Sequence, residues 1–338
     1  MQFGVSIPFI HDSDAKDPCE RTYRLCTLAE QAGFDFLSIG HHVFTPDYPT
    51  SAPFVILAAI AARTSRIRLA SVIYLLPLYH PVAVAEQVAT LDMISGGRAI
   101  FGIGVGYRPY EFQGFGVDPR HRGARADEAM AAIRSAWTTG RFNHEGRHFQ
   151  IPDLPAVPMP AQRPHPPMWV GGVSEAALRR AARLGDGWIS ANMQPFDALM
   201  AMADQYRAFC TEAGKEPFLC ISRDSWVAPT REALMEDWYR DIVDRHMGFR
   251  RMGFVSADPT GIYARLEAGE AVDPGEFIAD RAIGGTPAEC IGQIGRWRDR
   301  SGAQAMLMLL SKKASFEKLC TVIERFGAEV LPALRAQS

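Results

Sequence analysis

Residues 91–106 read Leu-Asp-Met-Ile-Ser-Gly-Gly-Arg-Ala-Ile-Phe-Gly-Ile-Gly-Val-Gly, and this stretch decides the fold class. A helical pattern stops at a pair of glycines, a short apolar strand follows one arginine, and the strand ends in Gly102, Gly104 and Gly106. This order is typical of one unit of a βα barrel, whose ligands bind at the C-terminal ends of the strands. Glycine lacks a Cβ, so a flat aromatic cofactor can approach the backbone there. The alternative is that the glycines only relieve crowding inside a tight barrel.

The rest of the chain repeats this alternation of apolar strands and amphipathic helices. Eight strands are predicted, over residues 2–8, 34–40, 67–75, 98–103, 167–171, 187–190, 218–227 and 305–310. Helices are predicted at about residues 19–32, 52–63, 80–94, 122–138, 174–185, 196–213, 231–247, 286–300 and 314–334. Alternation at this spacing indicates parallel βαβ units. Eight strands favour closure into a (β/α)8 TIM barrel, and we predict a single domain of this kind over residues 1–338.

Two segments interrupt this rhythm. Residues 140–167 are rich in Pro, His and Gly and predict an extended insertion with little regular structure. Residues 248–285 contain Gly and Asp-Pro pairs and predict a second long loop. Long loops within compact domains are usually functional or mobile. The second segment is therefore a candidate lid at the mouth of the barrel, and a plain surface excursion is the alternative.

The composition is that of an ordinary globular protein, with 47% hydrophobic and 22% charged residues. There are 36 Lys and Arg against 38 Asp and Glu, so no basic surplus points to nucleic acid or to an anionic membrane surface. The six cysteines share no metal-type spacing. The N-terminus lacks a signal-peptide pattern, and the longest apolar run, residues 54–62, is too short to cross a bilayer. We expect a soluble cytoplasmic protein with no metal, membrane or nucleic-acid partner.

His41 and His42 end the second predicted strand. A polar residue at the C-terminal end of a barrel strand faces the mouth of the barrel. Imidazole titrates near neutrality and acts as a base or a hydrogen-bond donor. Adjacent strand residues point to opposite faces, so at most one of the two faces the cavity. His41 is the catalytic candidate, and a structural role is the alternative.

A candidate anion site follows the strand predicted at residues 167–171, where Gly172 leads into a helix that begins at Ser174. Free N–H groups and the positive end of the helix dipole favour a phosphate at such a position. N-capping explains Ser174 equally well. Arg122 and Arg125 are able to pair with the same phosphate, although arginines are also ordinary at an exposed helix start.

Aromatic residues also occur at predicted strand ends, where a pocket would be lined. They are Phe9, Phe44, Tyr79, Tyr107 and Trp226. This distribution is a weak indication of an apolar substrate, and core packing, the usual role of buried aromatic residues, is the alternative.

A set of short motifs follows a fixed order along the chain. They are Phe3-Gly-Val-Ser6, His41-His42, Leu76-Pro77, His80-Pro81-Val82, Leu91-Asp92, Ser95-Gly-Gly-Arg98, Phe101-Gly-Ile-Gly-Val-Gly106, Glu111-Phe112, Phe115-Gly116, Pro166-Pro-Met-Trp-Val-Gly-Gly172, Ala181-Ala-Arg-Leu-Gly-Asp-Gly-Trp188 and Gly285-Thr-Pro-Ala-Glu-Cys290. Their order and spacing resemble those of the bacterial luciferase-like monooxygenases, a family of flavin and deazaflavin enzymes on a TIM barrel. The resemblance runs nearly end to end.

The resemblance implies roles for several residues at the ring of the cofactor. His41 matches the family's catalytic histidine, which assists oxygen chemistry at the flavin. The pair Val72-Ile73 falls where the family has a non-prolyl cis peptide against the ring system. Gly104 and Gly106 are expected to line that ring.

The resemblance also implies a phosphate site and a lid. Ser174 and the nearby backbone, with Gly172, match the family's phosphate site, and Arg122 or Arg125 is the assisting cation. Residues 248–285 match the family's mobile loop.

The function implied is a monooxygenase that uses O2 and reduced FMN from a separate flavin reductase to oxygenate a small, apolar organic molecule, as a homodimer. One alternative is an oxidoreductase that transfers hydride with the deazaflavin coenzyme F-420 and without oxygen. Another is a non-catalytic flavin-binding subunit. The sequence departs from the luciferase subunit at Gly40, where that subunit has glutamate, and at Val105, where it has a phosphate-contacting arginine. A neutral residue between the last glycines also occurs in deazaflavin-dependent members, so the cofactor stays open.

Overall fold

The structure is a computed structural model of the chain and describes residues 1–10, 16–45, 50–254 and 257–337. Two compact units can be distinguished. The first unit comprises residues 1–35, 190–208 and 218–338, and the second comprises residues 36–189 and 209–217. The extent of the domain, a single one over residues 1–338, stays a prediction.

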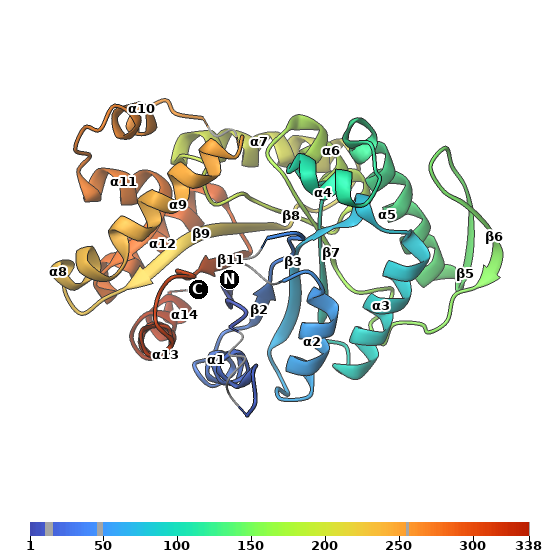
Figure 1. The fold of residues 1–338 in the computed structure, drawn as a ribbon, viewed down its shortest axis with the longest axis horizontal. Coiled ribbons are helices and arrows are strands. Elements are labelled where there is room, and N and C mark those ends of the chain that lie inside the picture. Colours follow the sequence, from blue (N-terminus) through green and yellow to red (C-terminus); the bar gives the residue numbers. More distant parts are fainter. Residues whose placement is uncertain (11–15, 46–49, 255–256, 338) are drawn as a thin grey trace. The chain divides into compact units, whose positions relative to one another are not determined.

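The second unit contains parallel strands and the helices that follow them (Figure 1). The strands pair in the order β2 (Phe36–Ile39), β3 (Arg68–Leu75), β4 (Ala99–Gly104), β7 (Met168–Gly171) and β8 (Gly187–Ile189). The helices are α2 (Pro53–Ala61), α3 (Pro81–Ile94), α4 (Pro109–Gly114), α5 (Arg122–Thr139) and α6 (Glu175–Leu184), with 3-10 turns η1 (Leu76–Leu78) and η2 (Pro119–His121). All residues of β2, β4, β7 and β8 are buried, as expected for parallel strands covered on both faces.

The first unit contains the other strands. They pair in parallel in the order β10 (Ala282–Gly285), β9 (Leu219–Val227), β11 (Ala305–Leu309) and β1 (Gln2–Ser6). The accompanying helices are α1 (Glu20–Gln31), α7 (Phe196–Glu212), α8 (Arg231–Leu234), α9 (Arg240–Arg251), α10 (Ile262–Glu267), α11 (Pro274–Arg281), α12 (Pro287–Ser301), α13 (Phe316–Arg325) and α14 (Leu331–Ala336), with π-helical turns η3 (Met235–Tyr239) and η4 (Phe326–Val330). In the described part of the chain, none of the helices combines the length and apolar character that crossing a bilayer requires.

Each of the eight predicted strands is confirmed, with ends within two residues of the prediction. They are found readily from sequence because a parallel strand buried on both faces is a continuous apolar run. Strand β10 was missed, since Ala282-Ile-Gly-Gly285 is short and half glycine.

Residues 140–167 are more regular than predicted. Strands β5 (Arg141–Glu145) and β6 (Gln150–Pro155) pair as an antiparallel hairpin next to α5 (Figure 1). The carboxylate of Glu128 on α5 accepts hydrogen bonds from the three backbone N–H groups of residues 147–149. The hairpin therefore depends on a contact distant in sequence, which a reading of the local Pro and Gly content could not reveal.

The prediction of a long loop over residues 248–285 is wrong. Helices α10 and α11 and strand β10 lie within this segment, of which residues 255–256 are outside the described residues. One Asp-Pro pair that suggested a loop instead begins a helix. The side chain of Asp273 accepts a hydrogen bond from the backbone N–H of Glu276, and Pro274 takes the first helical position. The segment's role as a lid stays a prediction.

Candidate active site

The glycine-rich end of β4 lies against a bulge in β3. The register of the two strands shifts within residues 71–74, and the Val72–Ile73 peptide bond is cis, as the resemblance implied. A Cβ added at Gly104 would lie 2.5 Å from Cγ2 of Ile73, and a Cβ added at Gly102 would overlap the backbone of β3. The glycines therefore make room for the bulged strand, which is the crowding alternative raised from the sequence.

The last glycine of this series has different surroundings. Gly104 is buried, whereas Gly106 is partly exposed and has a φ of +76°, a conformation that favours glycine. A Cβ at Gly106 would meet the ring of Phe112 at 3.0 Å. Val72 and Ile73 are also partly exposed, although the bulge is flanked by buried residues. Contact of these four residues with a cofactor ring stays a prediction.

The loop between β7 and α6 is shaped by close packing. Gly172 has a φ of +148°, and a Cβ there would lie 2.5 Å from Cβ of Ala177. The indole N–H of Trp188 donates to the carbonyl oxygen of Gly172 at 2.9 Å. Ser174 accepts a hydrogen bond from the backbone N–H of Ala177 and so caps α6, which confirms the N-capping interpretation. Phosphate binding by Gly172 and Ser174 stays a prediction.

The two arginines proposed as phosphate partners differ in exposure. Arg122 is exposed and donates to the carbonyl oxygen of Pro119 at 2.8 Å. Arg125 is partly buried, and its Nε–H donates to the carbonyl oxygen of Pro77 at 2.9 Å. Its guanidinium lies 4.7 Å from the ring centre of Phe149. Arg125 is therefore held by local contacts, with a cation–π interaction as one of them.

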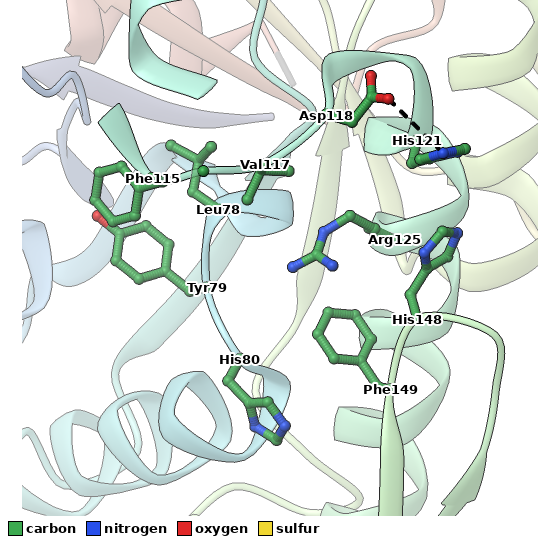
Figure 2. Close-up of a pocket in the computed structure, with 11 residues that line it drawn as sticks. Leu78, Tyr79, His80, Phe115, Val117, Asp118, His121, Arg125, His148 and Phe149 are labelled. Carbon is green, nitrogen blue, oxygen red and sulfur yellow. Dashed lines mark ion pairs between the residues drawn. The ribbon is translucent and has the colours of Figure 1, made fainter. Parts of the chain in front are cut away.

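A cavity of about 340 Å³ lies beside Arg125. The guanidinium of Arg125 points into it (Figure 2). It is lined by Leu78, Tyr79, His80, Phe115, Gly116, Val117, Asp118, His121, Arg125, His148 and Phe149. Burial lowers the pKa of Arg125 and the charge of Glu128 raises it less strongly. Neither Arg122 nor Ser174 is among the described residues that line this cavity. The structure thus does not bring Arg125 and Ser174 together in it.

His41 is almost fully buried, with 2% of its surface exposed. Its Nδ1 accepts a hydrogen bond from the backbone N–H of Leu75 at 3.1 Å, and its Nε2 lies 3.2 Å from the hydroxyl oxygen of Tyr79. The ring stacks on Tyr74 at a centroid distance of 4.6 Å. Because Nδ1 accepts, the neutral ring carries its proton on Nε2 and donates it to Tyr79.

The environment of His41 disfavours its charged form. Burial lowers the pKa of His41 to about 4, and the neighbouring His42 acts in the same direction. Burial also raises the pKa of Tyr79 to about 12, and the charge of Glu111 contributes. At neutral pH the pair is therefore a neutral imidazole that donates to a protonated phenol.

Glu111 is the polar residue at this site that the sequence reasoning missed. Its side chain is fully buried, and Oε1 lies 2.9 Å from Nδ1 of His42. The residue belonged to one of the family motifs, but nothing in the spacing indicated a contact across 69 residues of sequence. Helix α4, which positions it, was also not predicted.

A second buried polar cluster lies in the first unit. Nε2 of His246 lies 2.9 Å from Oδ2 of Asp224, and Nδ1 of His246 lies 2.8 Å from the hydroxyl oxygen of Tyr263. Burial opposes the ionisation of Asp224, but the charge of Arg245 and the contacts with His246 outweigh it and lower the pKa of Asp224 to about 2. The cluster joins β9, α9 and α10 through buried hydrogen bonds.

Comparison with known proteins assigns the family. The sequence profile described as luciferase-like monooxygenase matches residues 1–304. The chain is 35% identical over 189 residues to the uncharacterized protein y4wF of Sinorhizobium fredii, which covers 55% of this chain and 54% of that protein. It is 27% identical over 330 residues to the FMNH(2)-dependent dimethylsulfone monooxygenase of Pseudomonas putida, covering 92% of this chain and 87% of that enzyme. The crystal structure of monooxygenase RslO1 from Streptomyces bottropensis aligns over 98% of this chain and 99% of that chain, with a TM-score of 0.81 and 27% identity.

The chain therefore belongs to the luciferase-like monooxygenase family. Its fold class is the predicted TIM barrel, shared with RslO1. The predicted enzyme class, a luciferase-like flavin-dependent oxidoreductase, is confirmed by the family and by the named relatives. The alternative of a non-catalytic subunit is accordingly set aside.

Proposed function

We propose that this protein is a monooxygenase that uses reduced FMN and O2 to oxygenate a small, apolar organic molecule. The observation that carries the proposal is the partly exposed bulge of β3 at Val72 and Ile73, which is bordered by residues without side chains, Gly104 and Gly171. The side chain of Ile73 occupies the space that a Cβ at Gly104 or Gly171 would need, and the bulge itself stays partly exposed, so a planar ring can lie against Val72 and Ile73. The P. putida relative, similar over most of both chains, is FMNH(2)-dependent.

The residues present fit a flavin mononucleotide at both of its ends. Val72, Ile73 and Gly106 would hold the ring system. Gly172 and Ser174 would hold the phosphate, because the N-terminus of α6 presents backbone N–H groups and the positive end of its dipole. Arg125 or Arg122 would assist as a cation after a change of rotamer, in place of the arginine that Val105 replaces.

Reduced FMN, when bound, supplies the two electrons with which one atom of O2 enters the substrate and the other leaves as water. The chain's own residues position and shield this reaction. His41 donates to the hydroxyl of Tyr79 and fixes its orientation, so a catalytic role for His41 would act at that hydroxyl. The stacked rings of Tyr74 and Phe54, 4.5 Å apart, help to exclude water behind it.

An apolar substrate agrees with the aromatic side chains near Tyr79. The ring of Phe115 lies 5.1 Å from that of Tyr79, and the exposed ring of Phe44 lies 6.1 Å from that of Phe115. Such rings favour apolar or aromatic molecules. The buried Trp226, by contrast, is part of the core of the first unit.

The proposal includes the predicted partners and location. A relative that requires FMNH(2) uses flavin that is already reduced, so we propose a separate flavin reductase as a transient partner. The homodimer and the cytoplasmic location stay predictions.

A second candidate is hydride transfer with coenzyme F-420. The observation in its favour is Val105, a neutral residue between the last two glycines. The deazaflavin lacks the ring nitrogen needed for ready oxygen activation, so the cofactor decides the reaction.

The test is direct binding and turnover with both cofactors. Fluorescence quenching with FMN and with F-420, oxidised and reduced, gives the two affinities. We expect preference for reduced FMN, and O2 uptake when the protein is supplied with photoreduced FMN. A clear preference for F-420 would select the second candidate, and binding of neither would contradict both.

A further inference from the structure

The adjacent histidines at the end of β2 have different surroundings. His41 is buried, and both of its ring nitrogens lie within hydrogen-bond distance of neighbours from β3 and the segment after η1. The side chain of His42 is 20% exposed, and its Nδ1 lies 2.9 Å from Oε1 of the fully buried Glu111. Of these two histidines, His42 is thus the one that combines access to solvent with a carboxylate partner.

The direction of the hydrogen bond between His42 and Glu111 follows from a third group. The backbone N–H of Val43 donates to the same Oε1 atom at 3.2 Å, so this oxygen is an acceptor. Nδ1 of His42 is therefore the donor. A neutral imidazole with its proton on Nδ1 has its basic lone pair on Nε2. Glu111 accordingly selects the tautomer of His42 that carries its proton on Nδ1 and its basic lone pair on Nε2.

Glu111 is suited to stabilise a positive charge on His42. Its carboxylate is buried, and Oε2 has no hydrogen-bond partner among the residues that the structure describes. A buried carboxylate is costly unless an opposite charge lies close to it. An imidazolium at His42 supplies that charge at 2.9 Å. A carboxylate behind a histidine that fixes its tautomer and stabilises its cation is a recurrent arrangement in enzymes that move protons.

We propose that His42, oriented by Glu111, is the residue that moves a proton in the reaction of this site. The inference rests on the proposed function. In that reaction the reduced flavin gives up two electrons and two protons, one oxygen atom enters the substrate, and the other forms water with the two protons. One of these protons passes through Nε2 of His42. Glu111 is a positioning residue, and His41 supports Tyr79 from behind.

Several groups around His42 affect its titration. Among the described residues, His41 precedes it in the chain, Glu111 from α4 contacts its Nδ1, and the ring of Tyr107 after β4 lies 6.2 Å from its ring. Arg108 lies against the ring of Tyr107. The negative charge of Glu111 favours the imidazolium. His41 is neutral at pH 7 because burial lowers its pKa to about 4, so it adds no charge there.

The first test uses the full chain without cofactor, labelled with ¹⁵N at histidine. Long-range ¹H–¹⁵N spectra distinguish the two neutral tautomers of each ring. We expect His42 to be protonated at Nδ1 and His41 at Nε2, with His42→Gln and His41→Asn assigning the signals. In Glu111→Gln the preference of His42 for Nδ1 should weaken, because an amide both donates and accepts. Protonation of His42 at Nε2 in the wild type would overturn the proposal.

The second test needs no knowledge of the substrate. Without an organic substrate, O2 accepts the two electrons and two protons of the reduced flavin and forms hydrogen peroxide. With protein in excess over photoreduced FMN, the return of oxidised flavin is followed by absorbance as a function of pH. We expect His42→Gln to be about a hundredfold slower and to lose the pH dependence assigned to a general acid. Glu111→Gln should be about tenfold slower, with partial rescue in Glu111→Asp.

The matched control is His144→Gln in the hairpin. Nε2 of His144 lies 3.7 Å from Oε2 of Glu128, and the two side chains are 18% and 19% exposed, so it is also a partly exposed histidine beside a carboxylate. This variant should oxidise the flavin at the wild-type rate.

The outcomes separate the inference from the proposed function. A wild-type rate in His42→Gln with unchanged FMN affinity would overturn the inference and leave the function standing. A slower rate explained by a loss of FMN affinity would also overturn it. If the wild type binds neither FMN nor F-420, the proposed function fails and the role of His42 fails with it.

Discussion

The burial of His41 predicts that the protein loses stability as the pH falls from 7 to 5. The pKa of His41 is lowered from 6.5 to about 4 by burial, so between these values the unfolded chain binds a proton that the folded protein does not. The free energy of unfolding is therefore unaffected well above pH 6.5, falls as the pH drops below 6.5, and levels off below about 4.

The magnitude follows from the two pKa values. At pH 5 the unfolded histidine is almost fully protonated and the folded one almost fully neutral. Proton binding to His41 therefore favours the unfolded chain over the folded protein by about 2 kcal/mol at pH 5 and by about 0.2 kcal/mol at pH 7. His41 alone should thus remove about 1.8 kcal/mol of unfolding free energy between these pH values.

The assay is urea denaturation of the wild type and of His41→Asn at both pH values. The variant is less stable at pH 7 because it loses the contacts with Leu75 and Tyr79. Its loss between pH 7 and pH 5 should nevertheless be about 1.8 kcal/mol smaller than that of the wild type. Other acid-sensitive groups, such as the buried His246, contribute equally to both proteins and cancel. Equal losses in the two proteins would refute the reasoning.

Three further predictions concern stability. Gly104→Ala should destabilise the protein by about 1–3 kcal/mol through overlap with Ile73, whereas Gly292→Ala, where a Cβ meets open space in helix α12, should be neutral or stabilising; equal melting temperatures of the two variants would contradict this. Arg98→Lys should cost about 2–4 kcal/mol in a urea titration, because the guanidinium donates to the carbonyl of the last residue of α2, to two carbonyls between α2 and β3, and to one before β4; a change below about 0.5 kcal/mol would show that the guanidinium hydrogen bonds are dispensable. Asp224→Asn should cost about 3–5 kcal/mol, because it removes the carboxylate that pairs with the partly buried Arg245 and weakens the buried contact with His246, and an unchanged calorimetric melting temperature would count against a supporting role for that cluster.

The strand pattern could be predicted because it depends on burial alone. A strand such as β4 is apolar along its whole length, since helices cover both faces of a parallel sheet. The capping role of Ser174 was likewise local, since the hydrogen bond spans three residues. The hairpin in residues 140–167 was not predictable, because Glu128 of α5 orders its turn from about twenty residues away.

In the candidate site, too, the local features were predictable from the sequence and the contacts between distant residues were not. The sequence placed His41 and His42 at the end of one strand but could not assign their roles. The choice depends on what lies against each ring: Leu75 and Tyr79 against His41, and Glu111 against His42. Those contacts span 34 to 69 residues. No local spacing rule encodes them.

The sequence by itself determined the order of strands and helices, the family, and the end of each strand where polar and glycine residues gather, because periodicity and chain order express local conformation and burial. Only the tertiary structure decided that the space beside the glycines of β4 is filled by the bulge of β3. It also decided that His41 is buried and neutral, whereas His42 has the carboxylate of Glu111 beside it. Both properties arise from atoms brought together across the sheet. Steric overlap and electrostatic interaction act over a few ångströms of space, whatever the distance along the chain.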